Sequence, residues 1–170
     1  MLPLEQRIVE YIPNLRRYAR ALLRGNILAS DDLVQDCLER ALSRIHRWRE
    51  GSDLRAWLFT IMHNVYANQM RRLTNGPQFV ELTGDIELTD NTGAAEQQLK
   101  LRDLHHAIAD LQNDQREILL LVSLEGLRYQ QVSKILGIPE GTVMSKLSRA
   151  RQQLRKVMAE PKPDHIRRVK

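Results

Sequence analysis

Four side chains near the C-terminus have types and a spacing that suit contact with DNA. Thr142, Ser145, Lys146 and Arg149 recur at intervals of three and four residues, so a helix would place them on one face. Hydroxyl and basic groups hydrogen-bond to phosphates, and they also read base edges in the major groove. The pattern therefore predicts a DNA-binding helix over residues 141–158.

No comparable grouping indicates an active site or a metal centre. The five histidines show neither an HExxH motif nor another paired metal-ligand spacing. Cys37 is the only cysteine, which excludes an internal disulfide and a CxxC metal site. Glycine-rich phosphate loops and nucleophile motifs are also missing from the sequence. We therefore expect a protein that is not an enzyme and has no catalytic residue, metal or cofactor.

The predicted DNA-binding helix forms the second half of a helix-turn-helix. A short helix is expected over residues 129–136 and a turn over 137–139, where Gly137 permits a left-handed backbone. Val143 and Leu147 would bury the second helix against the first. An ordinary helical hairpin is the alternative, and the basic outward face favours the helix-turn-helix.

The preceding segment also shows helical periodicity. Apolar residues recur over 99–111, and Asp114 and Glu117 have the spacing of a capping box ahead of a further helix. Gly126 is the expected end of that helix.

The first 73 residues read as a three-helix unit. Apolar spacing predicts one helix over residues 4–24, and Ser30 is the expected N-cap of a second helix that extends to Ile45. Asp53 is expected to cap a third helix that extends to about residue 72. Cys37 lies on the apolar face of the second helix, which indicates a buried structural residue rather than a reactive thiol.

Charge is divided into three blocks. Residues 1–73 carry 12 basic and 8 acidic side chains, residues 74–95 carry 4 acidic and no basic ones, and residues 96–170 carry 14 basic and 9 acidic ones. The middle block is rich in Gly, Thr and Asn and lacks periodicity, so it is expected to be a flexible acidic linker. Two basic segments around an acidic one indicate two surfaces for a polyanion.

Composition limits the fold class. Of the 170 residues, 42% are hydrophobic, which is enough for a core, and only 5% are aromatic. The commonest types include Leu, Arg, Gln and Ala, which are good helix formers, so the composition favours an all-α protein. The sequence shows neither a signal peptide nor an apolar run of about 20 residues that could cross a membrane. We expect a cytoplasmic protein without membrane insertion, built from an N-terminal helical bundle (1–73), a linker (74–95), a helix-turn-helix domain (96–160) and a basic tail (161–170).

Three runs of residues carry a resemblance to a known family. The run over 125–151 resembles the C-terminal promoter-binding domain of bacterial sigma-70 family RNA polymerase sigma factors of the extracytoplasmic-function (ECF) group. The runs over 31–36 and 54–64 resemble the N-terminal domain of the same group. Their order and spacing also match, so the resemblance extends over residues 4–158.

The resemblance implies a factor that binds core RNA polymerase and directs promoter recognition, DNA melting and transcription initiation. Its implied partners are core RNA polymerase, promoter DNA and an anti-sigma factor. Two other functions stay open at this point, which are a sigma-like adaptor and a simple helix-turn-helix transcription regulator.

The resemblance also implies three groups of site residues. Contacts to the −35 element are expected from Arg128, Tyr129, Thr142, Met144, Ser145, Lys146, Ser148 and Arg149. Contacts to the −10 element are expected from Arg47, Trp48, Arg49, His63, Asn64, Asn68, Arg71 and Arg72. Contacts to core polymerase are expected from Leu33, Gln35, Asp36 and Glu39.

Some of these residues have an alternative interpretation. The family usually has a basic residue where Met144 stands and an aromatic or basic one near Ser148, so base contacts at these two positions are open. Trp48 either stacks on an unpaired base or anchors the core, and Tyr129 either touches the DNA backbone or packs.

Overall fold

The computed structural model describes residues 3–75 and 95–160, and every regular element in these ranges is a helix. The all-α prediction is therefore confirmed. The N-terminal domain consists of α1 (Leu4–Val9), α2 (Ile12–Leu22), α3 (Ile27–Ser43), the 3-10 turn η1 (Ile45–Arg47) and α4 (Leu54–Asn75). The C-terminal domain consists of α5 (Ala95–Ala109), α6 (Asn113–Leu119), the π-helical turn η2 (Leu120–Leu124), α7 (Tyr129–Leu136) and α8 (Glu140–Ala159).

The predicted boundaries at residues 73 and 96 fall close to the ends of described helices. Thr74 and Asn75 still belong to α4, and Ala95 is the first residue of α5. The rest of the predicted linker (76–94) and the predicted basic tail (161–170) lie outside the described residues. None of the described helices has the length and apolarity needed to cross a membrane.

The first predicted helix is in fact two helices. It is interrupted at Glu10 and Tyr11, and α2 then begins with Pro13 in its first turn. Proline has no N–H group to donate to the carbonyl four residues earlier, which ends a helix that runs into it. The same residue is well accommodated at a helix start, where that N–H group has no helical partner.

The predicted cap of α3 was wrong. The N-cap is Asn26, whose side chain accepts a hydrogen bond of 3.0 Å from the Ala29 backbone N–H. Ser30 lies inside the helix, where its buried hydroxyl is within hydrogen-bond distance of the carbonyl oxygens of Ala19 and Asn26. The Ser30 side chain therefore joins α3 to α2 instead of starting a helix.

Two other local predictions were confirmed by hydrogen bonds and backbone angles. Asp53 caps α4 by accepting a 3.0 Å hydrogen bond from the Ala56 N–H. Gly137 ends α7 in the left-handed region, with φ +65°, and the chain then turns into α8. The helix-turn-helix is thus present, with Val143 and Leu147 of α8 fully buried.

The predicted capping box before α6 was wrong. Gln112 is the N-cap, two residues before Asp114. The Glu117 carboxylate contacts His63 of the N-terminal domain, so it is not free to cap its own helix.

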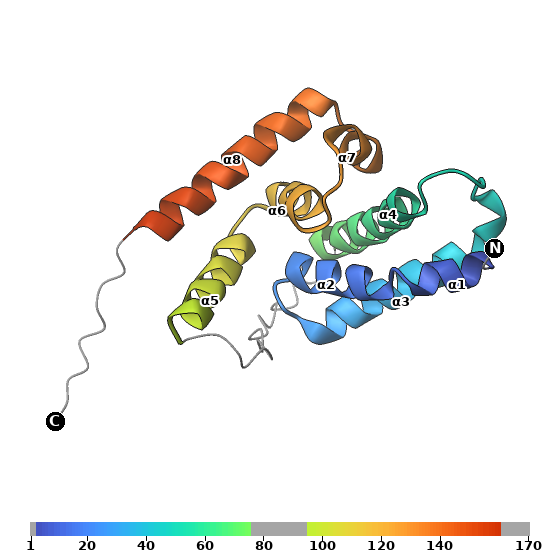
Figure 1. Cartoon of the computed structure of the whole chain (residues 1–170), viewed down its shortest axis with the longest axis horizontal. Helices are drawn as coiled ribbons and strands as arrows, with labels where there is room; N and C mark the ends of the chain where they lie inside the picture. The colour runs from blue at the N-terminus through green and yellow to red at the C-terminus, as the bar shows by residue number, and fades with distance from the viewer. Residues whose placement is uncertain (1–2, 76–94, 161–170) are drawn as a thin grey trace.

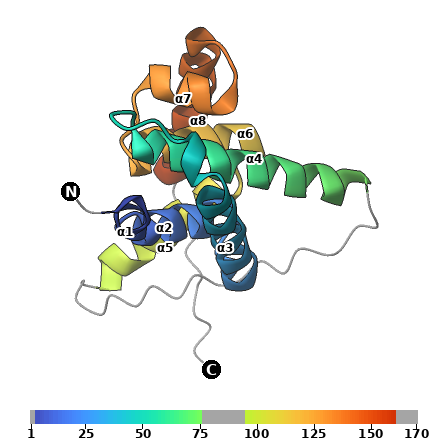
Figure 2. The same cartoon turned by 90° about the vertical axis from the view of Figure 1, so that its right-hand side faces the viewer.

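Each domain has an apolar core, and the two cores meet. In the N-terminal domain, Tyr18 and Phe59 pack edge to face with ring centroids 5.0 Å apart. Cys37 is also fully buried there, as the sequence predicted. Helix α7 packs against α4, whereas α5, α6 and η2 pack against α2 (Figures 1 and 2). The C-terminal domain therefore covers one side of α4 and the end of α2.

Candidate nucleic-acid interface

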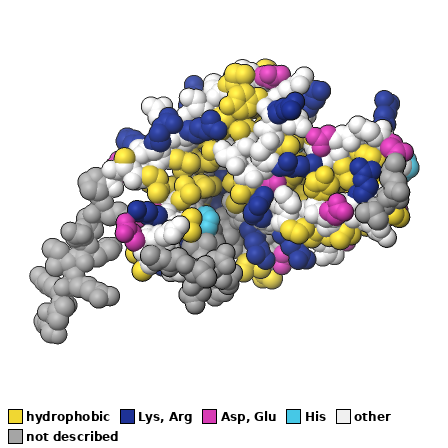
Figure 3. Space-filling model, viewed as in Figure 1, with side chains coloured by type: hydrophobic (Ala, Val, Ile, Leu, Met, Phe, Trp, Pro, Cys, Tyr) yellow, Lys and Arg dark blue, Asp and Glu magenta, His cyan; other side chains and the backbone are white. Residues whose placement is uncertain are grey.

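Helix α8 presents a polar face to the surface. Met144, Ser145, Ser148 and Arg149 are exposed, whereas Thr142 is only half-exposed at the first turn. Lys and Arg side chains gather along this helix (Figure 3). The structure therefore brings most of the predicted −35 residues together on one accessible surface.

Lys146 is less accessible than Ser145 and Arg149 on that face and pairs with an acid of α6. Its ammonium group donates a hydrogen bond to the Asp114 carboxylate of α6. This hydrogen bond holds the pKa of Asp114 below its usual value, with a smaller contribution from the Gln115 backbone N–H. In this structure the Lys146 ammonium group therefore forms an ion pair with an acid of its own domain.

Arg128 and Tyr129 lie at the start of α7, beside the α8 face. Arg128 is exposed, and Tyr129 is half-buried against the apolar core. Tyr129 also lines a shallow hollow of about 250 Å³ together with Met144, Ser148 and Arg151. The Tyr129 ring therefore packs against the apolar core and also lines this surface hollow.

The three predicted −10 residues of the loop differ in solvent exposure. Arg47 and Arg49 are exposed, while Trp48 is half-buried and packs against the N-terminal core. The Arg7 guanidinium lies 4.9 Å from the centre of the Trp48 ring. One face of the indole is therefore covered by a cation, which supports the anchoring interpretation of Trp48.

Helix α4 carries the remaining −10 residues. Asn64, Arg71 and Arg72 are exposed and Asn68 is half-buried. His63 differs from them because its Nδ1 lies 2.5 Å from the Glu117 carboxylate of α6. In this structure His63 contacts the C-terminal domain and is not free for DNA.

The predicted core-polymerase residues on α3 are mostly accessible. Gln35, Asp36 and Glu39 are exposed, and Gln35 donates a 3.1 Å hydrogen bond to Glu39. Leu33 is 0% exposed, so in this structure its side chain is not accessible to a partner. Its apolar side chain faces the domain core because α3 buries the stripe on which it lies.

The contacts between the two domains were not predicted from the sequence. The Glu125 side chain is 0% exposed and accepts hydrogen bonds from Asn14, Arg17 and Arg55 of the N-terminal domain. Asp53 Oδ2 also accepts a 2.6 Å hydrogen bond from Gln131 of α7. These pairs join residues 70 to 111 positions apart, and no periodicity in the sequence signals them.

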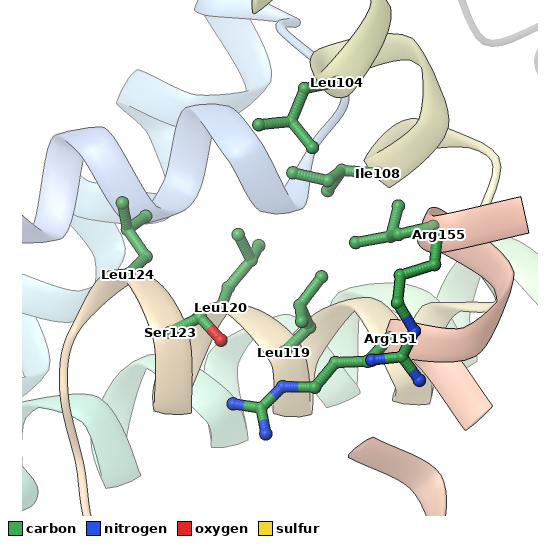
Figure 4. A pocket seen from close by; sticks show the side chains of 9 residues that line it. Leu104, Ile108, Leu119, Leu120, Ser123, Leu124, Arg151 and Arg155 are labelled. Carbon is green, nitrogen blue, oxygen red and sulfur yellow. The ribbon is translucent and has the colours of Figure 1, made fainter. Parts of the chain in front are cut away.

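The C-terminal domain also contains an apolar groove of about 390 Å³ (Figure 4). It lies between α5, the α6–η2 segment and α8, and hydrophobic side chains line most of it. The lining residues that define it are Leu104, Ile108, Leu119, Leu120, Leu124 and Leu154, with Arg151 and Arg155 on the α8 side. Its chemistry suits an apolar protein segment that also carries carboxylates.

Among the residues that the structure describes, no group of three or more His, Cys, Asp or Glu side chains could hold a metal ion. Burial raises the pKa of the Cys37 thiol to about 12, so the thiol stays protonated and unreactive in the folded protein.

Comparison with known proteins decides the family. The profile of the sigma-70 region 4 matches residues 101–154, and the profile of the sigma2 domain of PhyR matches residues 8–63. The ECF RNA polymerase sigma factor EcfG of Rhodopseudomonas palustris is 35% identical over 147 residues, which cover 86% of this chain and 80% of that protein. The chain belongs to the ECF sigma factors.

Solved structures agree with this assignment. The sigma factor RpoE of Bartonella quintana, solved in complex with the anti-sigma factor NepR, has a TM-score of 0.77 and 32% identity. The match covers 91% of this sigma factor and 96% of RpoE. The anti-anti-sigma factor PhyR from the same organism shares the fold, with a TM-score of 0.59 and 18% identity, but the match covers only 50% of PhyR. The family comprises transcription initiation factors rather than enzymes.

Proposed function

We propose that this sigma factor binds core RNA polymerase, recognises promoters through two separate DNA-binding surfaces and promotes strand opening. The observation that carries the proposal is the exposed polar and basic face of α8 on a helix-turn-helix. A helix of this kind suits the major groove, because its outward side chains can reach base edges. No catalytic step is needed for this function, and we place it in the cytoplasm with the polymerase.

We assign −35 contacts to the exposed α8 face, with Arg149 as its main basic group. The −10 contacts are assigned to Arg47 and Arg49 of the loop and to Asn64 of α4, and the core-polymerase contacts to the exposed acids of α3. All of these side chains lie at the surface.

An anti-sigma factor is the third proposed partner. RpoE of Bartonella quintana was solved with such a factor, and the apolar groove with its two arginines offers a surface for a protein segment.

Run-off transcription tests the proposed function directly. Bacterial core polymerase with this protein and a library of promoter sequences is expected to start transcripts at a shared pair of elements. Starts that do not depend on added protein or on template sequence would overturn the proposal.

The −10 assignment has its own test. Asn64→Ala is expected to reduce strand opening, measured by permanganate reactivity, more than it reduces formation of the closed complex. Asn75→Ala, at the exposed end of the same helix, is the matched control. Equal losses in both steps would remove Asn64 from the opening site.

An adaptor function is the second candidate, because the N-terminal profile match is to a domain of PhyR. An adaptor would bind an anti-sigma factor without supporting transcription. The run-off assay separates the two functions, since only a sigma factor yields sequence-dependent starts.

A further inference from the structure

Glu125 occupies a site that is built almost entirely by the other domain. Its carboxylate accepts hydrogen bonds from Asn14 Nδ2 at 3.3 Å, from an Arg17 guanidinium nitrogen at 3.1 Å and from an Arg55 guanidinium nitrogen at 3.4 Å. The Glu125 side chain is fully buried, whereas those of Arg17 and Arg55 remain 53% and 30% exposed. The donors therefore face both the carboxylate and the solvent around it.

The donor set carries more positive charge than its occupant neutralises. Two guanidinium groups converge on one carboxylate, and Asn14 adds a neutral donor. Guanidinium groups bind carboxylate and phosphate with the same geometry, because both anions present oxygen atoms to a planar fork of donors. A phosphate group would satisfy this site at least as well as Glu125 does.

The site adjoins a helix that the proposed function assigns to DNA. Arg55 lies in the first turns of α4, the helix that also carries Asn64. On the same side of α4, His63 is in contact with the Glu117 carboxylate of α6. Two carboxylates of the C-terminal domain, those of Glu125 and Glu117, thus lie against side chains of the helix to which −10 contacts are assigned.

We propose that Asn14, Arg17 and Arg55 form a binding site for a phosphate of the DNA backbone, and that the Glu125 carboxylate occupies this site while the two domains are in contact. The proposal rests on the proposed function and adds residues that no motif in the sequence indicated. DNA and the C-terminal domain compete for the same donors, so separation of the domains makes the site available.

The test uses a fork oligonucleotide of arbitrary sequence, because phosphate contacts carry no sequence information. Glu125→Gln keeps the size of the side chain and removes its charge. The full-length variant is expected to bind the fork several-fold more tightly than the parent, since the competing carboxylate is lost.

The second measurement is the dependence of the binding constant on salt. In the Glu125→Gln background, Arg17→Gln and Arg55→Gln are each expected to make the negative slope of log K against log salt shallower by about 0.7–0.9, the value for one lost phosphate contact. Arg16→Gln is the matched control, because Arg16 is exposed on the same helix and lies outside the cluster. Circular dichroism spectra verify that each variant is folded.

Two results would overturn the proposal. One is a fork affinity of Glu125→Gln that equals that of the parent, and the other is a salt slope that Arg17→Gln and Arg55→Gln change no more than Arg16→Gln does. Failure of the proposed function would instead be seen in the run-off assay with the parent protein. An ion pair with a purely structural role would change the stability of the variants and leave their salt slopes unchanged.

Discussion

Arg116 provides the sharpest test of what holds the C-terminal domain together. This arginine is only 2% exposed, and its guanidinium group lies at the junction of α5 and α6. It donates hydrogen bonds to the carbonyl oxygens of Ile108, Ala109 and Leu111, at 3.3, 3.3 and 2.8 Å. These oxygens come from the end of α5 and the turn after it, where helical partners run out.

The same guanidinium group also reaches the N-terminal domain. One of its nitrogens lies 3.1 Å from the carbonyl oxygen of Leu22 at the end of α2, and two of them contact the Asn113 side chain. Arg116 therefore stabilises the ends of two helices from different domains with one buried charge.

The magnitude follows from these contacts. A hydrogen bond to a charged group contributes about 1.5–3 kcal/mol, and contributions within one network are not additive. Arg116→Met keeps the length of the side chain, removes the charge and leaves the carbonyl oxygens without these donors. We expect a loss of about 3–5 kcal/mol in the free energy of unfolding, because several carbonyl oxygens lose their donor and each buried polar group left unsatisfied costs about 1–3 kcal/mol.

Thermal unfolding followed by far-UV circular dichroism measures this loss. A loss of 3 kcal/mol lowers Tm by about 12–24 °C if the C-terminal domain unfolds alone, and by about 6–12 °C if the whole chain unfolds as one unit. Arg116→Lys is expected to fall between parent and Arg116→Met, because one ammonium nitrogen reaches fewer carbonyl oxygens than a guanidinium fork. Arg102→Met, at an exposed position of α5, is the control. A Tm shift in Arg116→Met no larger than in Arg102→Met would refute the reasoning.

Three further predictions concern single positions. Gly137→Ala is expected to destabilise the protein by about 1–2 kcal/mol in urea unfolding through backbone strain alone, because φ is +65° and an added Cβ meets nothing within 4 Å. Gly141→Ala also meets nothing and should stabilise α8, so a loss of stability there would contradict this explanation. Burial raises the pKa of the Cys37 thiol from 9.0 to about 12, so the thiol ionises at a lower pH in the unfolded chain than in the folded one. The free energy of unfolding should therefore fall as pH rises from 9.0 to about 12, and this fall should be smaller in Cys37→Ala. Arg149→Ala is expected to weaken −35 recognition by about 1–3 kcal/mol, measured as the loss of −35-dependent run-off transcripts. Lys146→Ala is expected to have a smaller effect, because the Lys146 ammonium group is already bound to Asp114 of α6. Equal losses in the two variants would show that Lys146 contacts the −35 element as Arg149 does.

Features that depend on neighbouring residues were predicted correctly. Asp53 caps α4 and Gly137 ends α7 because each needs only its own backbone angles or an N–H group three residues away. The helix-turn-helix and the buried position of Cys37 follow from the period of apolar residues, which is also a local property.

Predictions failed where two local signals competed or where a distant partner intervened. Asn26 and Ser30 are both suitable N-caps, and α3 begins at the first of them because Ser30 is buried against α2. Glu117 has the spacing of a capping box, but its carboxylate binds His63, which is 54 positions away in the sequence.

Most of the helices, their apolar faces and the family of the chain were readable from the sequence, because these depend on spacings of three or four residues and on motifs within single helices. Which surfaces remain open is a consequence of the tertiary fold. Contact between the domains places Glu125 among Asn14, Arg17 and Arg55, and it engages His63 with an acid of α6. Such contacts depend on how the two folded domains pack against each other, and this packing produces no periodic pattern of residues in the sequence.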